Sequence, residues 1–164
     1  RYVCVCVDIF EFYYTTFPTA VVYFFHMFAT SFFSQANAVR ASRLAIALVY
    51  FWFGTLKLLG FSPAEPLVQD LFQHTLGWLM PFSVFYILFA LFEMAIGVGI
   101  LFKKFDRVMT YAIAAHLITT VLPLFVLPAT SWSGFMIPTL VGQYILKNAL
   151  IVSAVITIRA AEKK

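Results

Sequence analysis

The chain has 164 residues, of which 63% are hydrophobic and only 11% charged, and its mean hydropathy is +0.94. A chain with so few charges cannot cover its folded surface with polar groups. The composition therefore excludes a water-soluble globular protein and predicts an integral membrane protein. The net charge is +4. Because the basic residues lie singly or in short groups at the ends of apolar runs, they are expected to orient membrane helices, and no nucleic-acid partner is expected.

The N-terminal residues 1–42 are expected to form an accessory segment. Residues 17–33 are an apolar, aromatic run just long enough for a short membrane helix, and residues 34–42 (SQANAVRAS) are a polar break. A secretory signal would have an aliphatic centre and a small-residue cleavage site, which this segment lacks. We therefore expect an additional N-terminal membrane helix, followed by a four-helix transmembrane domain at residues 43–164.

Four apolar runs in that domain are long enough to cross the ~30 Å hydrocarbon core of a bilayer as helices. They are residues 44–61, 83–102, 108–127 and 140–158. Pro123 and Pro128 are expected to kink or end the third run, and residues 129–139 to form a short loop before the fourth. The predicted fold class is all-α, an integral membrane four-helix bundle.

An amphipathic helix is expected between the first two runs. Residues 62–65 (SPAE) have the form of a capping box, with Ser62 as N-cap and Glu65 reaching back. Apolar residues then recur at helical spacing, opposite a polar side: Leu67, Val68, Leu71, Phe72, Leu76 and Leu79 against Gln69, Asp70, Gln73 and His74. This pattern predicts a helix lying on the outer membrane surface.

The expected topology follows from the distribution of basic residues. The basic residues near the ends of the four runs all lie at the same membrane face: Arg40, Arg43, Lys103, Lys104, Arg107, Arg159, Lys163 and Lys164. The two opposite loops have no Lys or Arg. The positive-inside rule then places both ends of the four-helix domain in the cytoplasm or an equivalent compartment, and the amphipathic helix outside.

Glu93 is the most informative polar residue, because it is the single ionisable group near the middle of residues 83–102. A carboxylate at that depth must be protonated, paired with a cation or directed at a wet cavity. The other runs offer Lys57, His116 and Lys147 as partners, and a single inward-facing pocket in the outer half of the bundle would account for them all. The candidate site residues are Glu93 and His116 for catalysis, and Lys57, Gln143, Lys147 and Asn148 for cofactor binding.

Each of these residues also has a structural interpretation. Lys57 and Lys147 could simply extend to the outer interface, Glu93 and a lysine could form an ion pair that fixes helix register, and His116 could be a hydrogen-bonded packing histidine. As a haem ligand His116 would need a second partner such as His26, and no haem motif supports this.

The cysteines do not add a metal or redox site. Cys4 and Cys6 are too close in sequence to bridge easily, and they match neither a CxxC pair nor a zinc site. No haem and no metal are therefore predicted.

Three segments resemble helices of the DoxX family of small four-helix membrane proteins. They are residues 51–61 (FWFGTLKLLGF), 89–102 (FALFEMAIGVGILF, followed by a basic turn) and 142–154 (GQYILKNALIVSA). The resemblance covers roughly residues 43–159 and implies a four-helix bundle, with its polar positions carried over to Gly54, Lys57, Glu93, Gly97, Lys147 and Asn148. Some members of the family are membrane subunits of thiosulfate:quinone oxidoreductase, and others are linked to redox complexes.

Two functions of different classes stay open. In the first, the chain is a membrane subunit of a redox-associated complex whose outer pocket holds a quinone headgroup, non-covalently, with electrons supplied by a partner subunit. In the second, it is a non-catalytic structural or assembly subunit. The expected partners are the lipid bilayer and other subunits, in the bacterial inner membrane or an equivalent organelle membrane. A small transporter is less favoured, because no inverted repeat is visible.

Overall fold

The computed structural model describes Tyr23 and residues 34–162. The predicted N-terminal membrane helix, together with His26, Cys4 and Cys6, lies outside these residues. The chain divides into two compact units, Arg1–Ala38 and Val39–Lys164. The second unit holds the site described below.

The described part of the chain is mostly helical, with one small β-hairpin. The longer helices are α3 (Gln35–Leu58), α4 (Glu65–Thr75), α5 (Phe82–Gly99), α6 (Asp106–Val121), α9 (Leu140–Lys147) and α10 (Ala149–Glu162). The short elements are η1 (Lys103–Phe105), α7 (Pro123–Val126), α8 (Pro128–Ser131), β1 (Trp132–Gly134) and β2 (Ile137–Pro138).

Four helical stretches in the described residues are long and apolar enough to cross a membrane. They are Gln35–Leu58, Phe82–Gly99, Lys103–Val126 and Leu140–Ala161. The sequence-based expectation of a helical chain with four candidate membrane spans is therefore confirmed. Large apolar side chains on these helices remain exposed, including Trp52, Tyr111 and Leu150, as expected for surfaces that face lipid.

The polar residues 34–42 do not interrupt the first helix, contrary to the prediction. Helix α3 already begins at Gln35, and the backbone N–H of Asn37 donates to Ser34 Oγ at 3.3 Å. Ser34 thereby satisfies one of the free amides at the helix start, and the alanines and Arg40 that follow favour a helix. The helix therefore runs through this stretch, although the boundary between the two compact units, after Ala38, does fall within it.

The predicted capping box before α4 is also wrong. Helix α4 begins at Glu65 with Ala64 as its N-cap, and Pro66 rather than Pro63 occupies the first turn. Ser62 contributes only its backbone carbonyl, which accepts from the Glu65 N–H at 3.2 Å. A proline in the first turn costs no hydrogen bond, because that N–H has no helical partner in any case.

The region after α6 is more divided than the sequence suggested. The prediction that Pro123 kinks or ends the third run is confirmed, since α6 ends at Val121 and the separate short helix α7 begins at Pro123. The predicted loop at residues 129–139, however, contains most of α8 and an antiparallel hairpin in which Trp132 pairs with Pro138. The predicted fourth helix is broken at Asn148 into α9 and α10.

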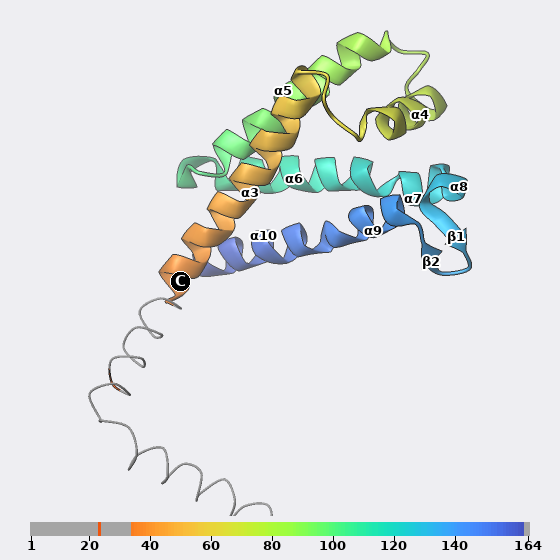
Figure 1. Cartoon of the computed structure of the whole chain (residues 1–164). Coiled ribbons are helices and arrows are strands. Elements are labelled where there is room, and N and C mark those ends of the chain that lie inside the picture. Colours follow the sequence, from red (N-terminus) through yellow and green to blue (C-terminus); the bar gives the residue numbers. More distant parts are fainter. Residues whose placement is uncertain (1–22, 24–33, 163–164) are drawn as a thin grey trace, which may run out of the picture. The chain divides into compact units, whose positions relative to one another are not determined.

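Helices α3 and α5 cross at close range through two glycines (Figure 1). A Cβ atom added at Gly97 would lie 2.8 Å from the Phe51 backbone nitrogen, and one added at Gly54 would lie 2.9 Å from the Ala90 carbonyl oxygen. Both separations are too short for any side chain. The two helices therefore touch backbone to backbone, as small residues allow in membrane helices.

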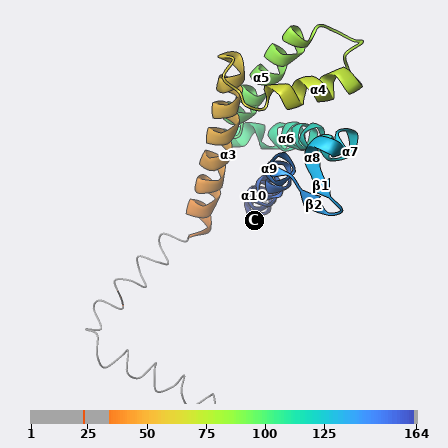
Figure 2. The same cartoon turned by 45° about the vertical axis from the view of Figure 1, so that its right-hand side comes forward.

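The remaining helices complete an aliphatic core. Helix α6 packs against α5, and α9 and α10 lie along α6 (Figures 1 and 2). The buried cluster draws on α3, the end of α5, α6 and α10, and consists of Ile46, Ala47, Tyr50, Ile96, Ile100, Ile113, Leu117, Val155 and Ile158.

A buried ion pair lies at one end of this core. Arg43 is 6% exposed and Asp106 3%, and the guanidinium donates to both carboxylate oxygens and, at 2.7 Å, to the Ile100 carbonyl. Bidentate pairing of this kind fixes geometry as well as charge. Arg43 was predicted only to orient the helices, and its role in joining α3 to the start of α6 was not predicted.

We predict that Gly97→Ala destabilises the protein, because its methyl group would force α3 and α5 apart. The expected loss is about 1–3 kcal/mol of unfolding free energy, the usual cost of overpacking, measured by thermal unfolding of the detergent-purified protein. Gly134→Ala is the matched control, since its Cβ would lie 3.4 Å from Ile137, in ordinary contact. An equal effect of the two substitutions would contradict the close crossing.

Candidate functional site

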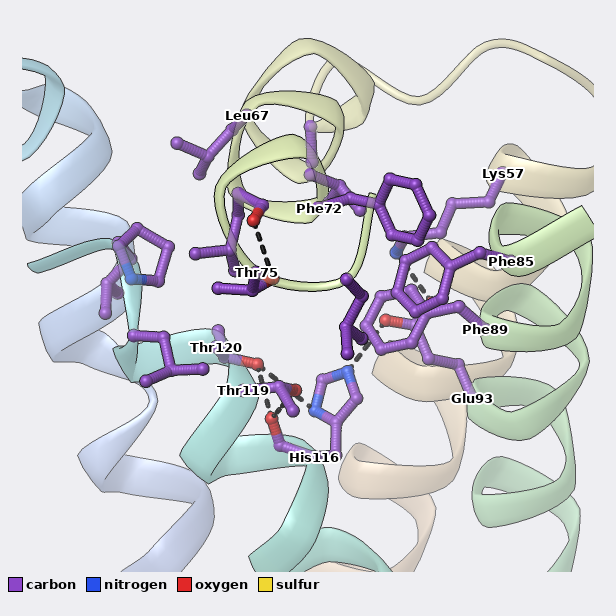
Figure 3. A pocket seen from close by; sticks show the side chains of 17 residues that line it. Lys57, Leu67, Phe72, Thr75, Phe85, Phe89, Glu93, His116, Thr119 and Thr120 are labelled. Atoms are coloured by element: carbon purple, nitrogen blue, oxygen red, sulfur yellow. Dashed lines mark hydrogen bonds and ion pairs between the residues drawn. The ribbon is translucent and has the colours of Figure 1, made fainter. Parts of the chain in front are cut away.

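Two side chains from neighbouring helices, Lys57 and His116, meet Glu93 of α5. The Lys57 ammonium on α3 donates to Glu93 Oε2 at 2.6 Å, and His116 Nε2 on α6 lies 2.8 Å from Glu93 Oε1 (Figure 3). The side chains of Lys57, Glu93 and His116 are 6%, 5% and 11% exposed. Both carboxylate oxygens thus have a partner within a buried network.

The close helix crossing explains why Lys57 can reach Glu93. Gly54 lies one turn before Lys57 on the same face of α3, and Ala90 and Gly97 lie on the same face of α5 as Glu93. All of these residues are buried. Because the small residues bring the backbones together, the lysine and the carboxylate meet directly.

Tyr50 extends the network on the other side of the histidine. Its hydroxyl is 3.2 Å from His116 Nδ1, and the two rings meet edge to face with centroids 5.0 Å apart. A carboxylate can only accept, so His116 Nε2 carries the proton that points to Glu93. In the neutral imidazole Nδ1 then accepts from the Tyr50 hydroxyl, and the tautomer is fixed by its neighbours.

A cavity of about 230 Å³ lies against this network. Lys57, Glu93 and His116 form its polar end, and Phe72, Phe85 and other apolar side chains form most of its walls (Figure 3). The ring of Phe89, which also lines the cavity, stacks on His116 with centroids 5.3 Å apart and an interplanar angle of 13°. The Lys57 ammonium lies 5.5 Å from the centre of the same ring.

Helix α4 forms one wall of the cavity. Its apolar residues Leu67, Val68, Leu71 and Phe72 face the cavity, together with Thr75 at its end, whereas the polar residues of its other side are exposed: Gln69, Asp70, Gln73 and His74. The amphipathic pattern that predicted a helix on the membrane surface is thus satisfied by packing over the protein's own cavity.

Three predicted site residues lie elsewhere. Gln143 and Lys147 are exposed on α9, where the Lys147 ammonium sits 4.9 Å from the centre of the Tyr144 ring, and Asn148 is half-buried at the break before α10. The residue of α9 that lines the cavity is Ile145. Ile145 is two residues from Gln143 and from Lys147, which on an α-helix is roughly the opposite side.

Several residues of the site were not predicted to belong to it. They are Tyr50, Thr75, Phe85 and Phe89, together with the apolar side chains of α4, which were expected to face the membrane surface. The spacing of Tyr50 and Lys57, two helical turns apart on one face, was the available signal. Among the described residues, no group of three or more His, Cys, Asp or Glu side chains could hold a metal ion.

The fold and the site together define a helical protein with four candidate membrane spans and a buried Lys–Glu–His network at the end of an aromatic cavity. No protein-family model, curated protein or solved structure matches the chain. Its function is therefore inferred from the chemistry of the cavity.

We predict that Glu93→Leu strongly destabilises the protein, because it leaves the Lys57 ammonium buried without a counter-charge. Breaking a buried pair on one side typically costs about 3–5 kcal/mol, whereas replacing both partners with apolar residues is often neutral. The double variant Lys57→Met with Glu93→Leu should therefore regain the part of the lost stability that comes from the unpaired ammonium, in thermal unfolding of the detergent-purified protein, while the His116 Nε2–H still lacks its acceptor.

Lys147→Met is the control for this series, because Lys147 is exposed and its loss should change stability by no more than about 0.5 kcal/mol. If Glu93→Leu cost no more than Lys147→Met, the buried ion pair would be contradicted.

Proposed function

We propose that the chain is a multi-pass membrane subunit of a redox-associated complex and that its cavity holds the ring headgroup of a quinone. The observation that carries this proposal is the network of Lys57, Glu93 and His116 at the polar end of an aromatic cavity. A quinone headgroup is a flat apolar ring with oxygens at its edge. It therefore suits aromatic walls that end in a few polar groups.

The donors and the size of the cavity support a ring ligand. An ammonium has three N–H groups, so Lys57 retains donors for a ring oxygen after bonding to Glu93. The cavity volume of about 230 Å³ is below the ~300–1,000 Å³ usual for drug-sized ligands. It matches a single ring, and an isoprenoid tail would extend out along the apolar surface.

The network can also move protons to or from such a ring. Reduction of a quinone takes two electrons and two protons, and oxidation of the quinol releases them. Glu93 can exchange a proton with a ring at the polar end of the cavity, and His116 and Tyr50, which are hydrogen-bonded behind it, can relay that proton. The sequence has no flavin, iron–sulfur or haem motif, so we assign the electrons to a cofactor on a partner subunit.

The proposed orientation follows from the basic residues. Lys103, Lys104 and Arg107 are exposed around η1, at the C-terminal end of α5, whereas α4 connects to the N-terminal end of α5. The positive-inside rule puts η1 in the cytoplasm or its equivalent and the cavity in the outer half of the bundle. A DoxX-like bundle in the bacterial inner membrane, or in an equivalent organelle membrane, fits this arrangement.

A structural subunit is the second candidate, and one observation favours it. The network joins α3, α5 and α6, and large aromatic side chains are exposed outside it, with Phe125 76% and Phe135 95% accessible. Such surfaces suit contacts with other membrane helices as well as with lipid. In this alternative the network would set helix packing and no ring would bind.

We predict that the protein extracted from its own membrane in mild detergent carries a quinone, detected as a mass increment by native mass spectrometry. The Lys57→Met and Glu93→Leu double variant should lose that increment while remaining folded, and Lys147→Met should retain it. A wild-type protein that is assembled with partner subunits but carries only phospholipid would contradict the quinone site and support the structural subunit.

A further inference from the structure

The polar side chains that line the cavity differ in whether they can still donate a hydrogen bond to a ligand or only accept one. Besides the network there are three threonines, and each hydroxyl already donates to a backbone carbonyl. Thr75 donates to Leu71 at 2.7 Å, and Thr119 and Thr120 both donate to His116, at 2.7 and 2.8 Å. Because a hydroxyl has a single hydrogen, these three oxygens are left as acceptors.

The network is also rich in acceptors. Each Glu93 oxygen receives one hydrogen bond, from Lys57 or from His116, and keeps a second lone pair. The Nε2–H group of His116 is occupied by Glu93, and its Nδ1 faces the Tyr50 hydroxyl at 3.2 Å and the Thr120 hydroxyl at 3.4 Å. Among the described side chains that line the cavity, Lys57 is thus the one with N–H groups to spare.

We infer that the cavity prefers the reduced, hydroxyl-bearing form of the ring, a quinol, to the oxidised quinone. This inference rests on the proposed function and specifies its ligand. A quinone has two oxygens that only accept, and beyond Lys57 the second oxygen meets acceptors. A quinol donates from both hydroxyls, so it can bond to Glu93 or to a threonine oxygen while Lys57 donates to it.

The size of this preference depends on the hydrogen bonds within the protein that a quinone would have to break. A threonine hydroxyl can turn its hydrogen towards a quinone oxygen, but it then gives up its bond to the backbone carbonyl. One net hydrogen bond corresponds to about a two- to tenfold difference in affinity. The quinol should accordingly bind about two- to tenfold more tightly for each hydroxyl that would otherwise have to turn.

The experiment is anaerobic equilibrium dialysis of the full-length detergent-purified protein against decylubiquinol and decylubiquinone, with protein-free micelles as the blank. The dimethyl ether of decylubiquinol is the matched ligand, because it keeps the ring and the oxygens but cannot donate. We expect the quinol to bind most tightly, and the ether to lose that advantage.

Two variants test the threonine oxygens directly. Thr75→Val and Thr120→Val remove an acceptor at nearly constant volume, so each should weaken quinol binding about two- to tenfold and leave quinone binding unchanged. Thr55→Val is the control, since Thr55 makes the same kind of bond, to the Phe51 carbonyl, outside the cavity.

The outcomes separate this inference from the proposed function. Equal or tighter binding of decylubiquinone, with the ether binding as well as the quinol, would overturn the preference and leave the quinone site intact. Binding of neither ring above the micelle blank would overturn both.

Discussion

The arrangement of the helices depends on one carboxylate placed in the middle of an apolar helix. Glu93 is 4% exposed within α5, a helix otherwise suited to lipid, and such a charge is tolerated only with close partners. Lys57 and His116 provide them from the two neighbouring helices. The requirement to pair Glu93 therefore fixes the rotation of α3 and α6 about α5, and the glycines at the α3–α5 crossing make the required approach possible.

A second buried ion pair is separated from the Lys57–Glu93 pair by the aliphatic core. Arg43 and Asp106 join α3 to the start of α6, fourteen residues along α3 from Lys57. Between the two ion pairs lies the aliphatic cluster that includes Ile96, Ile100 and Ile113. Among the described residues, the buried charged side chains thus lie at these two places, and Lys57 and Glu93 line the cavity.

Much of this could be predicted from the sequence, because the strongest signals are local. Apolar length predicts the spans, and an ionisable residue such as Glu93 inside one of them requires a partner. Which lysine pairs with Glu93 was not predictable, because the choice of Lys57 over Lys147 depends on how each helix is rotated about its axis. The amphipathic pattern of α4 is the same whether its apolar side covers a membrane or a cavity. The break at Asn148 has no proline or glycine to mark it.

Photolabelling of the purified protein with an azido-quinone, followed by mapping of the modified residues by mass spectrometry, would test directly whether the cavity beside Glu93 binds a ring. We expect labelling on the cavity walls, at Phe85, Phe89 and the apolar side of α4, and we expect excess decylubiquinol to suppress it. Labelling spread over lipid-facing residues such as Trp52 and Leu150, and insensitive to competitor, would contradict a ring site above Glu93.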